Sequence, residues 1–158
     1  MEELRVSSGG KAEKYKCLIS QIDAVLDGTV DIVANMANIA SMLHFTFGFW
    51  WTGFYRVVGD ELVLGPFQGP LACTKIARGR GVCGTAWSRG CTVVVPDVSL
   101  FPGHIACSSA SRSEIVVPML RIGHVVAVLD IDSDKTGTFD EVDRENLEII
   151  VSLLSRLQ

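Results

Sequence analysis

The segment "SEIVVPMLRIGHVVAVLDIDS", residues 113–133, places the strongest constraint on how this chain can fold. Two runs rich in apolar and β-branched residues flank Gly123, which predicts a hairpin of two strands that turns near this glycine. Aromatic and β-branched residues also dominate 49–58, and residues 61–67 predict the strand that returns from it. Consecutive hairpins of this kind favour an antiparallel sheet at the centre of the fold.

Helical spacing of apolar residues flanks these strands. It predicts helices at 11–26, 29–45 and 140–154 and a shorter helix at 82–89, while short strands are expected at 73–77 and 91–98. This order defines an α+β sandwich, and 158 residues are enough for one domain with a real core. Residues 1–10, which end in "SSGG", are expected to be a flexible tail, with a single domain over 11–158.

The distribution of charge and apolar residues excludes several classes of partner. The formal net charge is −4, and lysine and arginine are scattered, so no nucleic-acid partner is expected. No apolar run predicts a membrane-spanning helix, and the first residues lack the apolar centre of a signal peptide. We therefore expect a cytoplasmic protein without a membrane partner.

The chain has five cysteines, an odd number that excludes complete internal pairing. Cys73 and Cys107 each follow an alanine in a predicted loop of small residues, where a ligand or another sulfur atom can approach closely. Cys17, on an apolar helical face, and Cys91, at the start of a strand, are expected to be core residues. Cys83 lies near the start of a helix, where the helix dipole would lower the pKa of its thiol.

The cysteine spacing does not favour a metal site. Zinc sites normally bring ligands in pairs two to four residues apart, and the sequence has no CxxC pair. His104 precedes Cys107 by three residues, but a second close pair is missing. A cysteine–histidine hydrolase built on Cys107 and His104, His44 or His124 is also disfavoured, because no cysteine-protease signature is present.

Three carboxylates are predicted to meet at one end of the sheet. Asp130 and Asp132 are two residues apart in a strand and therefore share a face, while Glu114 opens the neighbouring strand of the hairpin. Such a group suggests a pocket for an ammonium ion or for a shared proton. Trp51 and Tyr55 share one face of an earlier strand, where core packing and a ligand-binding wall are equally good interpretations.

The motifs "WTGFY", "LVLGPFQG", "LACTKI", "GRGVCGTA", "GHIACSSASRSEIVVP" and "VLDIDS", in this order, resemble the free methionine-(R)-sulfoxide reductases, which are single GAF domains. The resemblance covers roughly residues 28–155. It implies a six-stranded antiparallel sheet with helices packed on one face and a loop-capped pocket on the other. It also implies a homodimer, an enzyme that needs no cofactor or metal, and thioredoxin as the reductant.

The same resemblance assigns roles to individual residues. It implies that Cys107 is the nucleophile, Cys73 its disulfide partner and Cys83 an additional resolving thiol. Glu114, Asp130 and Asp132 match the acidic substrate residues, Trp51 matches the aromatic residue near the substrate methyl group, and Tyr55 lies beside it. The implied reaction reduces free methionine (R)-sulfoxide through a sulfenic acid and an intramolecular disulfide.

Two other functions remain open from the sequence. GAF domains often bind small ligands as sensors, although an output domain is not recognised in this sequence. A catalytically silent structural domain is the second alternative. A sensor or a silent domain would keep its thiols reduced in the presence of methionine sulfoxide, whereas the reductase would oxidise them.

Overall fold

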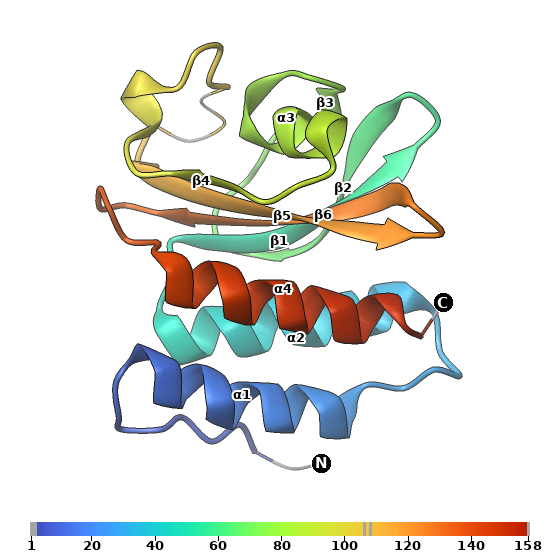
Figure 1. The fold of residues 1–158 in the computed structure, drawn as a ribbon, viewed down its shortest axis with the longest axis vertical. Helices are drawn as coiled ribbons and strands as arrows, with labels where there is room; N and C mark the ends of the chain where they lie inside the picture. Colours follow the sequence, from blue (N-terminus) through green and yellow to red (C-terminus); the bar gives the residue numbers. More distant parts are fainter. Residues whose placement is uncertain (1–2, 106, 108, 158) are drawn as a thin grey trace.

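A six-stranded antiparallel sheet runs through the middle of the molecule in the order β3-β2-β1-β6-β5-β4 (Figure 1). The computed structural model describes residues 3–105, 107 and 109–157. The strands are β1 (Trp51–Val58), β2 (Glu61–Gln68), β3 (Lys75–Ala77), β4 (Val93–Val95), β5 (Ser113–Arg121) and β6 (His124–Ser133). The predicted α+β class and both predicted hairpins are confirmed.

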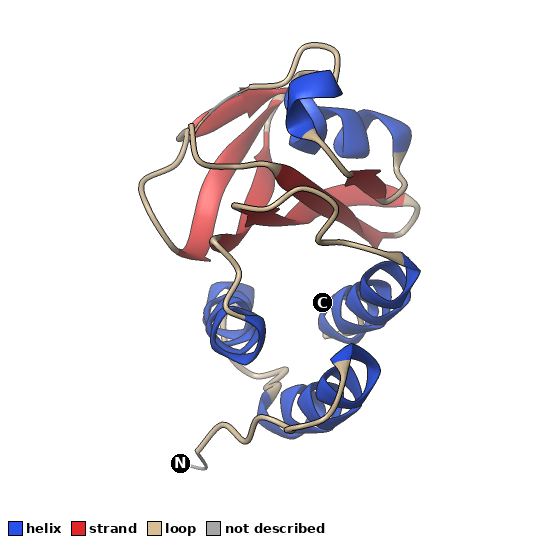
Figure 2. Ribbon diagram, turned by 90° about the vertical axis from the view of Figure 1, so that its left-hand side faces the viewer, coloured by secondary structure: helices blue, strands red, loops and turns tan. Residues whose placement is uncertain are grey.

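The helices are α1 (Lys11–Val25), α2 (Ile32–Phe47), α3 (Gly81–Arg89) and α4 (Glu141–Ser155), with a short 3-10 turn, η1, at Val98–Leu100. α2 and α4 lie against one face of the sheet and α1 lies beneath them, while α3 and the long loops occupy the opposite face (Figures 1 and 2). The predicted arrangement is therefore confirmed for the three longer helices, and α3 belongs to the cap over the pocket side.

The second helix begins at Ile32, three residues later than the sequence predicts. The reason is a cap: the carboxylate of Asp31 accepts a hydrogen bond from the backbone N–H of Val33. The helix ends at Phe47, and its C-cap, Gly48, has a φ of 68°. This left-handed conformation suits glycine and turns the chain into β1.

Alternating side chains along β1 and β6 build a separate core on each face of the sheet. Phe54, Leu129 and Ile131 are fully buried against the helices α1, α2 and α4. Tyr55 and Val128 are buried on the other face, with α3. This division follows the two-residue period of a strand, and it places Asp130 and Asp132 on one face, as predicted. That face is the one covered by α3.

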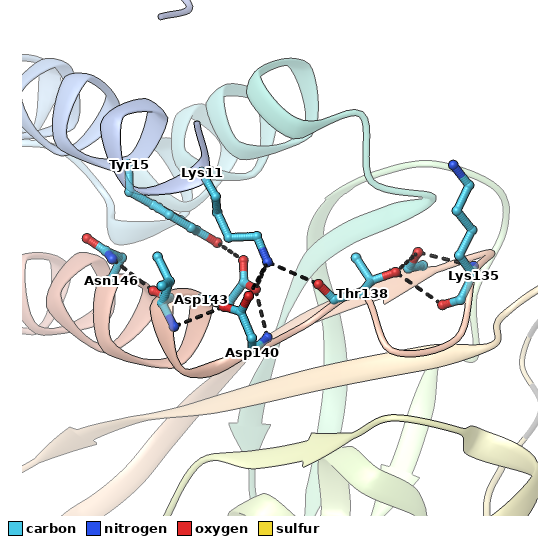
Figure 3. A network of polar contacts seen from close by, with 9 residues as sticks. Lys11, Tyr15, Lys135, Thr138, Asp140, Asp143 and Asn146 are labelled. Carbon is cyan, nitrogen blue, oxygen red and sulfur yellow. Dashed lines mark hydrogen bonds and ion pairs between the residues drawn. The ribbon is translucent and has the colours of Figure 1, made fainter. Parts of the chain in front are cut away.

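An ionic cluster joins the start of α1 to the start of α4 (Figure 3). Asp143 is fully buried and accepts hydrogen bonds from Lys11 Nζ at 2.5 Å and from Tyr15 Oη at 2.7 Å. Asp140 caps α4 and also pairs with Lys11. Because Tyr15 and Asp143 are both buried, this cluster fixes the position of α1 on the rest of the domain.

Residues 3–10 run along α1 without regular structure. The backbone N–H of Arg5 donates to Oε1 of Gln21 on α1, and Nε2 of Gln21 donates to the carbonyl oxygen of Arg5. Two cysteines expected in the core lie elsewhere. Cys17 is only half-buried and Cys91 is exposed, because β4 begins two residues after Cys91, at Val93. No helix among the described residues has the length and apolar character needed to cross a membrane.

Candidate active site

A pocket lies on the α3 face of the sheet, between α3, the loop before β3 and the long loop before β5. It brings together the residues that the sequence predicts for the site. Its lining includes Trp51, Tyr55, Cys83, Cys107, Glu114, Asp130 and Asp132. The remaining predicted residue, Cys73, joins the pocket through a covalent bond to Cys107.

The disulfide between Cys73 and Cys107 links the two loops that cover the pocket. Its Cα atoms are 5.6 Å apart, and 34 residues separate the two cysteines in the sequence. Tyr55 Oη donates a hydrogen bond to the carbonyl oxygen of Cys73 at 2.9 Å, which holds this loop against β1. The disulfide therefore lies at the edge of the pocket, where it joins the two covering loops.

Strand pairing positions the three carboxyl groups. Glu114 on β5 is directly opposite Asp132 on β6, and Asp130 lies two residues before Asp132 on the same face. Only 5% of Glu114 and 6% of Asp130 are exposed. Two acids directly opposite each other destabilise a sheet when both are ionised, so this arrangement indicates a functional constraint.

Burial makes these carboxyl groups hold protons more tightly than usual. Burial and the neighbouring Asp132 raise the pKa of Glu114 well above its ordinary value. Burial, then Asp132 and Glu114, raise the pKa of Asp130 in the same way. Burial also raises the pKa of Asp132 to about 6, although Ser111 Oγ donates a hydrogen bond to its Oδ1. The pocket therefore favours the protonated form of these carboxyl groups more strongly than water does.

Cys83 projects from the first turn of α3 into this acidic group. Its Sγ lies 4.0 Å from Oε1 of Glu114, and the side chain is buried. Burial first, and the carboxylates of Asp130 and Glu114 second, raise the pKa of its thiol well above the ordinary value. The expected lowering by the helix dipole is therefore wrong, because desolvation and the neighbouring acids outweigh the dipole.

Possible ligand atoms of Cys83, Glu114 and Asp130 lie within 4.8 Å of one another. The sequence spacing did not favour a metal site, and the fold nevertheless brings a thiol and two carboxyl groups together. Their raised pKa values explain this proximity without a cation, because groups that keep their protons do not repel one another as charges.

Aromatic rings form the wall of the pocket nearest β2. Trp51 stacks on Phe67 at 5.3 Å between ring centroids and on Tyr55 at 5.9 Å, and its Nε1 donates to the carbonyl oxygen of Pro70. A Cβ atom on Gly53 would lie 2.5 Å from the ring of Trp51 and from Cβ of Phe67. Glycine at this position therefore allows the indole to lie flat along the strand.

Sequence reasoning gave no role to His104, which also lines the pocket. Its Nε2 lies 3.6 Å from Oε2 of Glu114, and its side chain is only 15% exposed. The signal in the sequence was its place three residues before Cys107. That spacing by itself points only to a metal site or a hydrolase, because the contact partner, Glu114, comes from the next strand.

The GAF domain family matches residues 21–157 of this chain. The chain therefore belongs to the GAF domain family. Its relatives include a free methionine-R-sulfoxide reductase from Escherichia coli, which is 42% identical over 93% of this chain and 90% of the relative. GAF domain-containing protein A from Dictyostelium discoideum is 53% identical over 97% of this chain and 98% of the relative.

The fold also matches that of a solved structure. The X-ray structure of free methionine-R-sulfoxide reductase from Neisseria meningitidis, in complex with its substrate, matches with a TM-score of 0.96 and 50% identity. The match covers 99% of this chain and 95% of the other. The fold class predicted from the sequence and the predicted family are thereby confirmed.

Proposed function

We propose that this protein reduces free methionine (R)-sulfoxide to methionine. The single observation that carries the proposal is the Cys73–Cys107 disulfide beside a pocket lined by three protonatable carboxyl groups. A disulfide here is the expected oxidised end state of a sulfoxide reduction that uses two thiols. The relatives named free methionine-R-sulfoxide reductase support the same activity.

The first step transfers the sulfoxide oxygen to Cys107. A protonated carboxyl group, assigned to Glu114 or Asp132, donates its proton to the sulfoxide oxygen, which is otherwise a poor leaving group. The thiolate of Cys107 attacks the sulfur atom. Methionine leaves, Cys107 becomes a sulfenic acid, and the carboxylate is left without its proton. The step balances: the thiolate, one proton and the sulfoxide give the sulfenic acid and methionine.

The second step resolves the sulfenic acid. The thiol of Cys73 attacks the sulfur of Cys107, the disulfide forms, and the oxygen leaves as water. A dithiol protein, for which we propose thioredoxin, then reduces the disulfide by exchange. Cys83 is a weaker candidate for the resolving thiol, because its raised pKa keeps it protonated beside Glu114 and Asp130.

The pocket also suits the free amino acid. Asp130 is buried, and its Oδ1 has no hydrogen-bond partner among the described residues. We assign it to support of the substrate ammonium group, which would satisfy this oxygen. Methionine sulfoxide within a peptide chain lacks this ammonium group, and Trp51 supplies an apolar surface for the methyl group.

The decisive experiment uses separated R and S forms of free methionine sulfoxide and the N-acetyl derivative of the R form. Oxidation of NADPH through thioredoxin reductase and thioredoxin reports turnover. We expect turnover with the free R form and little with the other two compounds. A sensor or a silent domain would bind or ignore the compounds, would keep its thiols reduced and would consume no NADPH.

A further inference from the structure

His104 contacts the carboxyl cluster from the loop that carries Cys107. The 3.6 Å approach of its Nε2 to Oε2 of Glu114 is the one ion pair described for the acids of the pocket. Its backbone N–H donates to the carbonyl oxygen of Phe101, so a turn fixes the start of the loop. The His104 side chain thus extends from the loop that carries Cys107 to Glu114 on β5.

The surroundings of His104 are acidic. Glu114 faces it from β5, and Asp132 lies on β6 directly opposite Glu114. His104 holds the pKa of Asp132 lower than burial alone would. The other titratable groups of the pocket are Asp130 on β6, Cys83 on α3, Tyr55 on β1 and Arg80, which precedes α3. Carboxyl groups therefore outnumber cations in the lining of this pocket.

The proposed reaction leaves two protons to be accounted for. Cys107 must lose its proton before it attacks, and the carboxyl group that protonates the sulfoxide must regain one before the next turnover. The donor is deeply buried: only 7% of the Glu114 side chain is exposed, against 15% for His104. A group that contacts Glu114 and sits on the Cys107 loop can close this cycle.

We propose that His104 relays the proton released by Cys107 to Glu114, which it contacts. This inference rests on the proposed reductase function. The cycle balances: the thiol of Cys107 and neutral His104 give a thiolate and an imidazolium, and the imidazolium and the carboxylate of Glu114 give neutral His104 and the carboxylic acid. His104 acts through Glu114 and Cys107 and makes no bond to the substrate.

The test compares H104Q with wild type over pH 5 to 9, using free methionine (R)-sulfoxide and saturating thioredoxin. We expect kcat to fall about 10²-fold at neutral pH, as for loss of a group that moves protons. The dependence of kcat on pH should flatten, and added imidazole should restore part of the rate. H124Q is the matched control, because His124 is exposed and lies at the opposite end of β6 from Asp132.

Each outcome decides the question. An H104Q enzyme with the wild-type rate and pH profile overturns the inference, and so does a loss that is equal at every pH and insensitive to imidazole, since it would indicate a structural role alone. Failure of wild type to turn over would refute the proposed function instead. If H104Q does not fold, H104N is measured in its place by the same criteria, with the thermal unfolding curve as the check of folding.

Discussion

Glu114 and Asp132 are opposed across β5 and β6 with Asp130 beside them, and each has a raised pKa. Such an arrangement costs stability in an ordinary sheet. It is useful in a pocket that must hold a proton at neutral pH, because burial keeps a carboxyl group in its acid form. The chemistry that we assign to the pocket depends on this balance between burial and repulsion.

Replacing the acids separates proton donation from substrate binding. E114Q and D132N keep the shape of the side chain but cannot supply a proton, so loss of the donor should lower kcat by about 10²–10⁴-fold. D130N should act mainly on KM if Asp130 supports the ammonium group. Steady-state kinetics with free methionine (R)-sulfoxide measures both constants. Unchanged kcat and KM in all three variants would contradict the proposed pocket.

Serine variants of the two loop cysteines should block the reaction at different steps. C73S should release about one methionine per enzyme and then stall, because the sulfenic acid on Cys107 lacks its resolving thiol. C107S should release none, since a hydroxyl group is a far weaker nucleophile toward sulfur. Single-turnover assays with mass spectrometry count the methionine and the oxidised cysteines. Sustained turnover by C73S, with a Cys83–Cys107 disulfide, would assign the resolving role to Cys83.

At the scale of elements, the position of α1 depends on one buried carboxylate. Asp143 on α4 accepts hydrogen bonds from Lys11 and Tyr15 on α1, and its side chain also accepts from the backbone N–H of Asp140. The ion pair joins residues 132 positions apart in the sequence and connects the first helix to the last (Figure 3). α1 therefore belongs to the same folded unit as the sheet.

Removing this carboxylate should loosen α1. D143A leaves the buried hydroxyl of Tyr15 without its acceptor, while Lys11 keeps Asp140 and the carbonyl oxygen of Thr138. We expect a loss of about 1–3 kcal/mol of stability. E141A is the matched control on the same turn, because the Glu141 side chain is 69% exposed; a change within about 0.5 kcal/mol is expected for it. Urea unfolding measures both. Equal midpoints for the two variants would show that the cluster contributes little.

At the scale of the whole molecule, the acids of the pocket couple stability to pH. The pKa of Asp132 is about 6 in the folded protein and about 3.9 in an unfolded chain. The folded state thus binds more protons between these values, so the contribution of Asp132 is fully present below the lower pKa and is lost as pH rises through the upper one. The melting temperature of wild type should therefore fall as pH rises from about 4 to 8. In D132N this fall should be smaller, and D132N should be more stable than wild type at pH 8. A steeper fall in D132N would contradict the assignment.

The redox state should also change global stability. The Cys73–Cys107 disulfide spans 34 residues, and the lost chain entropy of a loop of this size corresponds to about 4 kcal/mol. We expect the oxidised protein to melt at a higher temperature than the reduced protein. C73S should show no such difference, and C91S, which alters an exposed thiol, should keep it. Thermal unfolding with and without a reductant makes this comparison.

Local pattern in the sequence was enough for the elements and for the faces of the strands. The period of two residues in 113–133 determined that Asp130 and Asp132 share a face opposite Leu129 and Ile131, because side chains alternate in any strand. The helical spacing likewise located α1 and α4 to within a residue or two at each end. The acid cluster at one sheet end was predictable from the hairpin alone.

The tertiary structure decided the electrostatics and the contacts between distant segments. The thiol of Cys83 has a raised pKa because the fold buries it beside Asp130 and Glu114, whereas its local position near a helix start indicated the opposite. The contact of His104 with Glu114 and the exposure of Cys91 were equally hidden. Desolvation and charge act through space, and the spacing of residues along a chain does not record which atoms the fold will bring together.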